Sequence, residues 1–382
     1  MKTALFLAML VGLVLMMLTR PSRPSQRRGC VDAVLPAYNE QLCIAASVEG
    51  LLSHPMIDRV IVVNDGSTDG TRAELDLLAR RHGTRLVAIH QANTGKGGAL
   101  MRGIGHVRTE AVFLTDADTL IPHDLGLAHL LGEIERGADA VGGIPSSNLV
   151  GAGLLPHIRA TVKLPMIALR RTFQQMLGGA PFIVSGACGM FRVSALRATG
   201  FCDRTKVEDL DLSWTLVARG YRVRHSNRCV VFPQECNNVA DEWRRWRRWI
   251  VGYAVCMRLH WPLLSSRFGL FSILPMFLVV AVGIMAYLTG LAVAATTHFP
   301  VALIAFLFPL LWVAIVSLIG AFSAWHHRCA ALIPLAPFAL FYVLLSYTIW
   351  AVHGLAGLLT GREPKRDKPT RYAPQEARNV VD

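Results

Sequence analysis

The sequence has few charged residues for its length. Asp, Glu, Lys and Arg make up only 17% of its 382 positions, while hydrophobic residues make up 53%. An ordinary soluble protein is more charged and less apolar than this. The excess of apolar residues is concentrated at positions 5–18 and 270–359. The length accommodates two domains, or one domain and a membrane part, and this distribution favours the second arrangement.

Paired cysteines are also lacking. The chain contains eight cysteines, but none forms a CxxC pair, and no group of Cys and His has the spacing of a zinc site. No internal repeat or long low-complexity segment is present in the sequence. We therefore expect reduced thiols in a domain that lies in the cytosol.

Basic residues outnumber acidic ones, and the formal net charge is +13. A basic surface can meet anionic lipid headgroups or nucleic acid. The basic residues that flank the apolar runs are Arg20, Arg23, Arg27 and Arg28 on one side and Arg362, Lys365, Arg366, Lys368 and Arg371 on the other. This placement favours membrane lipids as the partner, because positive residues gather on the cytosolic side of membrane segments. No nucleic-acid motif accompanies it, so no nucleic-acid partner is expected.

The first apolar run, residues 4–18, is short for a membrane-spanning helix, which needs about 20 residues. A cleaved signal peptide is therefore the alternative interpretation. No A-x-A cleavage pattern follows the run, and the basic residues directly behind it hold that end on the cytosolic side. These two observations favour an uncleaved membrane anchor at residues 1–20.

The middle of the chain alternates between strand-like and helix-like segments. The β-branched runs lie at residues 31–35, 60–63, 86–89, 111–114 and 140–144. Strands that alternate with helices predict an α/β fold with a mostly parallel sheet covered on both faces. In such sheets the ligand site lies at the carboxyl ends of the strands. Further along, we predict a strand and turn at residues 182–192 and two short strands at residues 221–225 and 229–232.

Two helices outside the globular part are predicted from apolar and basic spacing. Residues 151–177 form either a membrane-surface helix or a packed linker helix. Residues 241–259 carry tryptophans and arginines close together, a combination typical of an amphipathic helix at the level of the lipid headgroups.

The C-terminal apolar runs, residues 270–295, 301–322 and 332–359, are each long enough to cross a bilayer. Three crossings from a cytosolic domain would leave the C-terminus outside, yet the basic tail should stay inside. One run is therefore re-entrant or interfacial, or one long run holds two crossings. The number of crossings stays open at this point.

Carboxylates follow three of the predicted strands. These turns contain Glu40, then Asp65 and Asp69, then Asp116 and Asp118. Clustered acids repel one another unless a cation joins them, and Mg²⁺ or Mn²⁺ held there would bind a diphosphate. The alternative is that such residues only make turns and helix caps. For Asp69 and its neighbour Ser67 the two interpretations are evenly balanced, whereas an acid-x-acid pair at the end of a buried strand favours a ligand.

Two further polar segments are ambiguous by themselves. Lys96 lies in a Gly-rich turn that lacks the Ser or Thr of an ATPase phosphate loop and the third glycine of a dinucleotide fingerprint. It can still reach an anionic ligand from a helix start. Glu208, Asp209 and Asp211 lie within a few residues at a predicted helix start, where acids also serve to cap the helix.

The order of these motifs carries more information than any one of them. The chain contains PAYNE, VNDGSTDGT, NTGKGGAL, DAD, SGACGMFR, VEDLDLSW and RWRRWIVG in that order. This series, over about residues 31–252, resembles glycosyltransferase family 2. It is most similar to the membrane synthases of extracellular polysaccharides, such as poly-N-acetylglucosamine, chitin, hyaluronan and cellulose synthases. The resemblance implies a GT-A fold between N- and C-terminal transmembrane helices.

The resemblance also implies roles for single residues. The residues implied to bind the nucleotide-sugar donor are Pro36, Tyr38, Glu40, Asp65, Lys96, Asp116 and Arg248. Asp118 matches the metal-binding acid of the DxD motif, and Asp209 matches the general base. The residues implied to lie at the acceptor are Ser185, Gly186, Cys188, Glu208 and Trp249. The implied cofactor is Mg²⁺ or Mn²⁺.

Two positions depart from the family's pattern. Arg245 stands where the QxxRW motif has Gln, and Val207 stands where the Thr-Glu-Asp motif has Thr. Both motifs are tied to processive synthesis, so chain extension is less secure than sugar transfer. Arg248 and Trp249 keep the last two residues of QxxRW, and Gly252 supports that register.

These observations predict an inverting, metal-dependent transferase in a bacterial inner membrane, with its catalytic domain in the cytosol. UDP-N-acetylglucosamine is the first candidate donor and a β-linked polysaccharide the first candidate acceptor. The alternatives are transfer of one sugar to a membrane lipid or polyprenyl phosphate, and a non-catalytic partner of another synthase. An accessory subunit or a homo-oligomer is a further hypothesis, because few crossings are predicted. The predicted parts are an anchor at 1–20, a GT-A domain at 29–236, an interfacial region at 237–267, membrane helices at 268–360 and a basic cytosolic tail at 361–382.

Overall fold

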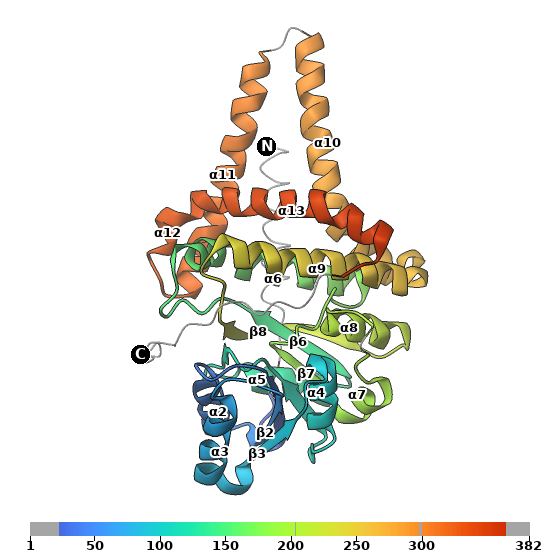
Figure 1. The fold of residues 1–382 in the computed structure, drawn as a ribbon. Coiled ribbons are helices and arrows are strands. Elements are labelled where there is room, and N and C mark those ends of the chain that lie inside the picture. The colour runs from blue at the N-terminus through green and yellow to red at the C-terminus, as the bar shows by residue number, and fades with distance from the viewer. Residues whose placement is uncertain (1–22, 203, 298–299, 364–382) are drawn as a thin grey trace.

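The computed structural model of the protein describes residues 23–202, 204–297 and 300–363. The predicted anchor at residues 1–20 and nearly all of the basic tail lie outside these ranges. Figure 1 shows a sheet with its helices at one end of the molecule, a layer of long helices next to it, and two helices that project from the far side of that layer.

A mixed sheet of eight strands forms the centre of the α/β part. Its strand order is β3-β2-β1-β4-β7-β6-β8-β5. The strands are β1 (Val31–Ala37), β2 (Ile57–Asp65), β3 (Leu86–Gln91), β4 (Ala111–Leu114), β5 (Thr119–Leu120), β6 (Ala140–Pro145), β7 (Gly189–Arg192) and β8 (Val223–Pro233). The pairs β1–β2, β2–β3, β1–β4 and β6–β8 are parallel, whereas β7 runs antiparallel to β4 and β6, and β5 runs antiparallel to β8. The predicted α/β class with a largely parallel sheet is confirmed.

Helices cover both faces of this sheet, as predicted. They are α2 (Ile44–Ser53), α3 (Thr71–His82), α4 (Gly95–Ile104), α5 (Gly126–Glu135), α7 (Val193–Thr199) and α8 (Glu208–Ala218), with a short 3₁₀ turn η1 at Gly83–Arg85. Successive strand residues point to opposite faces. On β1, Leu35 therefore packs in the same apolar cluster as Leu75 of α3, whereas Val34 packs in the other cluster with Leu100 of α4 and Trp214 of α8.

One detail of the sheet differs from the prediction. The two short strands predicted at 221–225 and 229–232 form the single strand β8. The pairing of β8 with β6 shifts register between Gly142 and Ile144. The polar residues Ser226 and Asn227 interrupt the apolar pattern at that point, although the backbone stays extended through them. Pairing with β6 on both sides of this irregularity thus overrides the local pattern.

Three long helices form the layer next to the sheet. They are α6 (Leu154–Gly178), α9 (Val239–Leu259) and α13 (Ala339–Thr360). The short elements η2 (Trp261–Ser265), η3 (Gly269–Ile273), α12 (Leu332–Leu335) and η4 (Ala336–Phe338) connect this layer to α10 (Leu274–Thr296) and α11 (Val301–His326). The Asn238 side chain caps α9 by accepting a hydrogen bond from the Asp241 N–H, at 2.8 Å between the heavy atoms. A polar cap there explains why the predicted Arg/Trp helix begins where it does.

The last apolar run does not form one continuous helix. It is divided among α12, η4 and α13, and α13 packs along α9. Figure 1 shows α10 and α11 projecting from the molecule while α13 lies across their base. By length and composition, one segment among the described residues, Leu332–Thr360, is long and apolar enough to cross a membrane, although buried core helices meet the same criterion. The direction of α13 therefore differs from that of α10 and α11 (Figure 1), and α13 packs on α9.

Candidate active site

The polar turns that follow β1 and β2 are hydrogen-bonded to each other at the carboxyl edge of the sheet. The Asn39 N–H donates to the Ser67 hydroxyl at 2.9 Å, and the Thr68 N–H donates to Asn39 Oδ1 at 2.7 Å. Asn39 has a φ of +53°, a left-handed conformation that asparagine tolerates better than most residues. The Glu40 N–H donates to Thr71 Oγ1 at 2.8 Å, so the end of β1 is also tied to the start of α3.

Asp65 connects this edge to the Gly-rich turn. It is 3% exposed, and its Oδ1 accepts hydrogen bonds from the Thr94 N–H and from Gln91 Nε2, both at 2.8 Å. One of its oxygens therefore shapes the turn that precedes Lys96. Asp69 accepts from the N–H and the hydroxyl of Thr71, at 3.0 and 2.5 Å, at the start of α3. This geometry favours the turn-forming interpretation for Asp69.

Three separate elements bring charged groups together near the end of β4. Lys96 Nζ at the start of α4 lies 2.6 Å from Asp116 Oδ1 and 3.3 Å from Glu208 Oε1. Asp209, the next residue on α8, accepts a hydrogen bond from the Gly186 N–H at 2.9 Å. A Cβ atom added at Gly186 would lie 2.9 Å from Lys96 Nζ, so the loop approaches the lysine closely. We call Lys96, Asp116, Glu208 and Asp209 the acid–lysine cluster.

The acid–lysine cluster changes the acidity of Asp209. Burial raises the pKa of its carboxyl group, and the nearby negative charge of Glu208 raises it further. The positive charge of Lys96 and the hydrogen bond from Gly186 act in the opposite direction but do not cancel the rise. A carboxylate with a raised pKa is a stronger base than an exposed one, so Asp209 has the properties that proton abstraction requires.

The three acids at the start of α8 have different surroundings. Asp211 has partners outside the acid–lysine cluster: it accepts from Arg204 Nε at 2.9 Å, and its Oδ1 lies 2.6 Å from His260 Nε2. Burial alone would raise the pKa of Asp211, but the hydrogen bonds with His260 and Arg204 outweigh it and lower the pKa. Simple capping of α8 therefore does not account for these acids, since their side chains have separate partners.

Asp118 lies on the short connection between β4 and β5. Its Oδ1 accepts from Thr119 Oγ1 at 3.3 Å, and its backbone oxygen accepts from the Gln234 N–H at 3.1 Å. Within the described ranges, no set of three His, Cys, Asp or Glu side chains is arranged to hold a metal ion. Mg²⁺ is commonly held by one or two carboxylates together with phosphate oxygens of the substrate. The half-buried Asp118 fits that donor set, provided that the phosphate oxygens come from the ligand.

The other residues implied by the family resemblance differ from one another in burial and in the element that carries them. Tyr38 is 41% exposed just after β1, and Pro36 lies within β1, paired with Val63 of β2. Ser185 lies in the same loop as Gly186, and its backbone oxygen accepts from the Cys188 N–H at 3.0 Å. The Cys188 side chain is fully buried, with its sulfur 3.7 Å from the Cys229 sulfur.

The Cys188 side chain packs in the apolar cluster that contains Met190, and its place at the acceptor stays a prediction. All eight cysteines are free, as predicted. The hydrogen bond with the Cys188 thiol, together with burial, raises the pKa of Cys229, which keeps that thiol protonated.

Arg248 and Trp249 lie on α9. Trp249 packs against the apolar cluster that contains Trp214 and Val207. Val207 replaces the family's Thr, and it is 4% exposed. A Cβ atom added at Gly252 would lie 2.5 Å from Val207 Cγ2, so α9 packs directly on the segment that leads into the acid–lysine cluster.

Glu363 is a residue that the sequence pattern did not predict. Its carboxylate accepts from the Thr205 hydroxyl at 2.5 Å and from the Lys206 N–H at 2.8 Å, just before Glu208 and Asp209. Nothing in the local sequence could have indicated a contact between residues 157 positions apart. The end of α13 is thereby attached to the segment that carries two of the predicted site residues.

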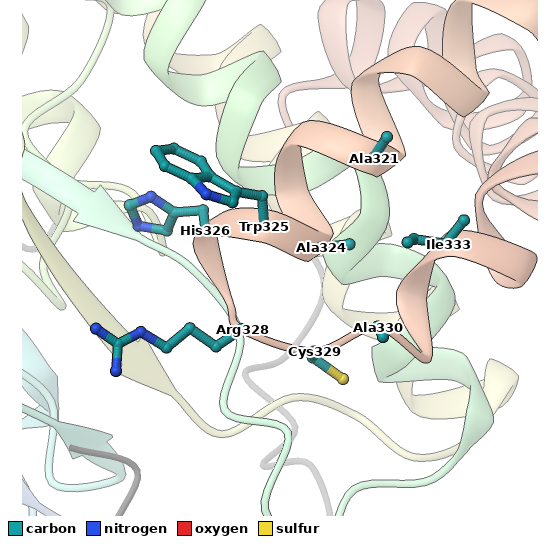
Figure 2. A pocket seen from close by; sticks show the side chains of 8 residues that line it. All are labelled: Ala321, Ala324, Trp325, His326, Arg328, Cys329, Ala330 and Ile333. Atoms are coloured by element: carbon teal, nitrogen blue, oxygen red, sulfur yellow. The ribbon is translucent and has the colours of Figure 1, made fainter. Parts of the chain in front are cut away.

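A separate pocket of about 650 Å³ lies at the turn between α11 and α12. Figure 2 shows its lining, with Trp325, His326 and Arg328 on one side and Cys329, Ala330 and Ile333 on the other. It contains none of the residues predicted to bind donor or acceptor. The arrangement that suits sugar transfer is therefore the acid–lysine cluster at the edge of the sheet.

Comparison with known proteins shows which family the chain resembles. The family model described as Glycosyl transferase family 2 matches residues 32–200. The uncharacterized glycosyltransferase YaiP of Escherichia coli (strain K12) is 61% identical over 375 residues, which cover 98% of this chain and 94% of YaiP. A poly-beta-1,6-N-acetyl-D-glucosamine synthase of Staphylococcus epidermidis is 27% identical over 243 residues, which cover 62% of this chain and 58% of that synthase.

One solved structure has a similar fold over nearly the whole chain. It is the mannosyltransferase PcManGT from Pyrobaculum calidifontis in complex with GDP-Man and Mn²⁺, with a TM-score of 0.58 and 19% sequence identity. The match covers 95% of this chain and 97% of that one. At this identity the likeness shows the fold alone, and it confirms the GT-A-like architecture. With the family model and a relative at 61% identity, the chain belongs to glycosyltransferase family 2.

Proposed function

We propose that this protein transfers a sugar from a UDP-sugar to the end of a β-linked polysaccharide, with UDP-N-acetylglucosamine as the first candidate donor. The observation that carries the proposal is the acid–lysine cluster, in which Asp209 lies beside a lysine and two further acids. The similarity to a poly-beta-1,6-N-acetyl-D-glucosamine synthase supports the choice of donor and product.

In the proposed reaction, Asp209 accepts the proton of the attacking acceptor hydroxyl. The Gly186 N–H holds one oxygen of Asp209 in place, so that the carboxylate is oriented before the acceptor arrives. Direct attack on the anomeric carbon expels the nucleoside diphosphate and inverts the configuration, without a covalent intermediate. Lys96 and Arg248 are proposed to contact the donor phosphates. A bound Mg²⁺ or Mn²⁺, held by Asp118, would supply positive charge where the diphosphate departs.

The pH dependence of the reaction follows from the raised pKa of Asp209. Because the base must be deprotonated, we expect kcat/KM to fall as the pH decreases through a value above the ordinary pKa of 3.8. In Lys96→Met this acid limb should move to higher pH, since Lys96 lowers the pKa of Asp209. Arg102→Met, an exposed residue on the same helix, is the control and should leave the limb in place. An unmoved limb in Lys96→Met would show that Asp209 is not the titrating base.

The second candidate function is transfer of one sugar to a membrane lipid or a polyprenyl phosphate. The specific observation in its favour is that Arg245 and Val207 occupy positions tied to processive synthesis, and Val207 is buried against α9. Mass spectrometry of the products from a panel of nucleotide sugars tests both candidates. A ladder of oligomers supports chain extension, and a single addition supports the lipid acceptor. Neither transfer nor donor hydrolysis with any donor would favour the non-catalytic partner and overturn the proposed function.

We further propose that α10 and α11 enter the membrane as a hairpin while α13 stays at its surface. The two helices have 23 and 26 residues without a charged side chain. On α13, Phe341 and Val352 are 68% and 53% exposed, while Ile349 is buried. A helix that is apolar on both faces, with one face on α9, is suited to lie on lipid. In this layout residues 29–236 form the catalytic domain and residues 237–267 the interfacial region.

This layout resolves the conflict between three crossings and a basic C-terminal tail. Two crossings return the chain to the side on which it entered, and Glu363 contacts the catalytic domain through Thr205. We expect a C-terminal green fluorescent protein fusion to fluoresce and a C-terminal alkaline phosphatase fusion to be inactive in a bacterial host. The matched control is fusion of each reporter after Thr297, at the end of α10, which should give the opposite pattern. Active phosphatase at the C-terminus would contradict the two-crossing layout.

A further inference from the structure

A network of buried charges lies between α6, α9 and the segment after β8. Its acids are Glu235 and Glu242, and its bases are Arg159, Lys163 and Arg245. Arg245 Nη1 donates to Glu235 Oε2 at 2.7 Å, and Arg245 Nη2 pairs with Glu242. Arg159 pairs with Glu235 and lies 3.4 Å from Glu242, and Lys163 pairs with Glu235. We call these five residues the charge network.

The charge network is costly to bury. The side chains of Glu235 and Glu242 are 1% exposed, and that of Arg245 is 12% exposed. Burial lowers the pKa of Lys163 to about 8, although Glu235 opposes the change. Replacing a buried ion network by apolar residues is often neutral or even stabilising. The network therefore calls for a role other than stability.

Two arginines of the charge network lie against the ring of Trp249. The guanidinium carbon of Arg245 lies 5.4 Å from the Trp249 ring centroid, and that of Arg159 lies 5.8 Å from it. Both distances fall within the range of cation–π attraction. Trp246 meets the same ring edge-on, with 5.6 Å between centroids. The orientation of Trp249 thus depends on where these two guanidinium groups are held.

The same network is connected to α13. Glu242 Oε1 accepts from the Tyr342 hydroxyl at 2.6 Å and from Trp246 Nε1 at 2.8 Å. A hydrogen-bonded path therefore runs from Tyr342 through Glu242 to Arg245, which lies against Trp249. The Gln that the family's motif has at this position is uncharged and could not form ion pairs with both carboxylates. The planar guanidinium group of Arg245 pairs with Glu235 and Glu242 at once.

We propose that Arg245 and Tyr342 are positioning residues that set the orientation of the Trp249 ring against the acceptor sugar. The proposal rests on the proposed function, in which Trp249 lines the acceptor site. Neither residue needs to touch the sugar. Arg245 acts through its stacking on Trp249, and Tyr342 acts by fixing Glu242, which in turn fixes the Arg245 guanidinium group.

The test compares acceptor and donor kinetics in the full-length protein in detergent. The probes are UDP-N-acetylglucosamine and a β-1,6-linked N-acetylglucosamine tetrasaccharide. We expect Arg245→Gln to raise the acceptor KM about tenfold, the effect of losing one charge-assisted interaction, with donor KM unchanged. Tyr342→Phe, which loses a single hydroxyl, should raise the acceptor KM in the same direction by less. Donor hydrolysis without acceptor should be unchanged in both variants, a result that a general loss of folding would not give.

Two controls make the outcome specific. Arg247→Gln, an exposed arginine on the same helix, should leave the acceptor KM at the wild-type value. The double variant Arg245→Gln/Tyr342→Phe should be no worse than Arg245→Gln, because both act along one path. If Arg245→Gln fails to fold, Tyr342→Phe still decides the question. An acceptor KM that is unchanged in Tyr342→Phe, or an equal loss for donor and acceptor, would overturn the positioning role. A wild-type protein that transfers no sugar would instead overturn the proposed function and this inference with it.

Discussion

Asp209→Asn is expected to abolish sugar transfer while donor binding survives. The substitution removes the proton acceptor but keeps a side chain of the same shape, whose amide oxygen can still accept the hydrogen bond from the Gly186 N–H. General-base catalysis contributes typically about 10²–10⁴-fold, so the loss should be at least of that order. Radiolabelled-sugar transfer measures the loss, and isothermal titration with UDP measures the remaining affinity, which we expect to stay within about threefold, less than one typical hydrogen bond contributes.

Asp211→Asn provides the matched comparison two residues further along α8. Asp211 binds Arg204 and His260, partners outside the acid–lysine cluster. We expect this variant to unfold at a lower temperature but to retain proton transfer. Near-normal turnover in Asp209→Asn would remove it as the base. An equal loss in both variants would mean that the start of α8 is only structurally important.

Removal of divalent metal should eliminate activity almost completely. In EDTA the proposed enzyme lacks the metal cation that neutralises the charge of the departing diphosphate. Lys96 does not replace this cation, because its ammonium group is paired with Asp116 and Glu208. We expect activity to return when Mg²⁺ or Mn²⁺ is added in excess. The measurement is the transfer rate after dialysis against EDTA and after titration with each metal. Transfer that persists in EDTA would reject the metal role.

The variant Asp118→Asn tests whether Asp118 itself is the metal ligand. An amide oxygen is a weaker ligand than a carboxylate, so the variant should require more metal for half-maximal activity and reach a lower maximum. The control is Asp58→Asn, an acid that is exposed near the start of β2. Unchanged metal dependence in Asp118→Asn would move the metal to another group of the site.

Much of the site could be predicted because its acids follow strands. Asp65 and Asp116 stand at the ends of apolar runs that form parallel strands, and parallel strands end at one edge of the sheet. The acid–lysine cluster was only partly foreseeable, since Lys96 and Glu208 were ambiguous as single motifs. Their distances to Asp116 depend on how α4 and α8 pack.

Contacts between distant segments could not be predicted from local patterns. A β-branched pattern interrupted at Ser226 and Asn227 predicted two strands, and pairing with β6 made one. The burial of the Cys188 side chain in an apolar cluster was equally invisible in the local sequence. The length of the run at residues 332–359 was compatible with a crossing, and packing along α9 makes α13 a separate helix across the base of α10 and α11.

The amino-acid sequence by itself determined the α/β class, the order of the family's motifs and the departures at Arg245 and Val207. These features are local, because hydrophobic periodicity and short motifs depend on neighbours along the chain. Only the tertiary structure decided that Lys96 meets Glu208, that Glu363 holds the segment before Asp209, and that Tyr342 reaches Glu242. Such contacts join residues about a hundred or more positions apart, and they form because buried charged and polar groups must find partners wherever the packed elements bring them together.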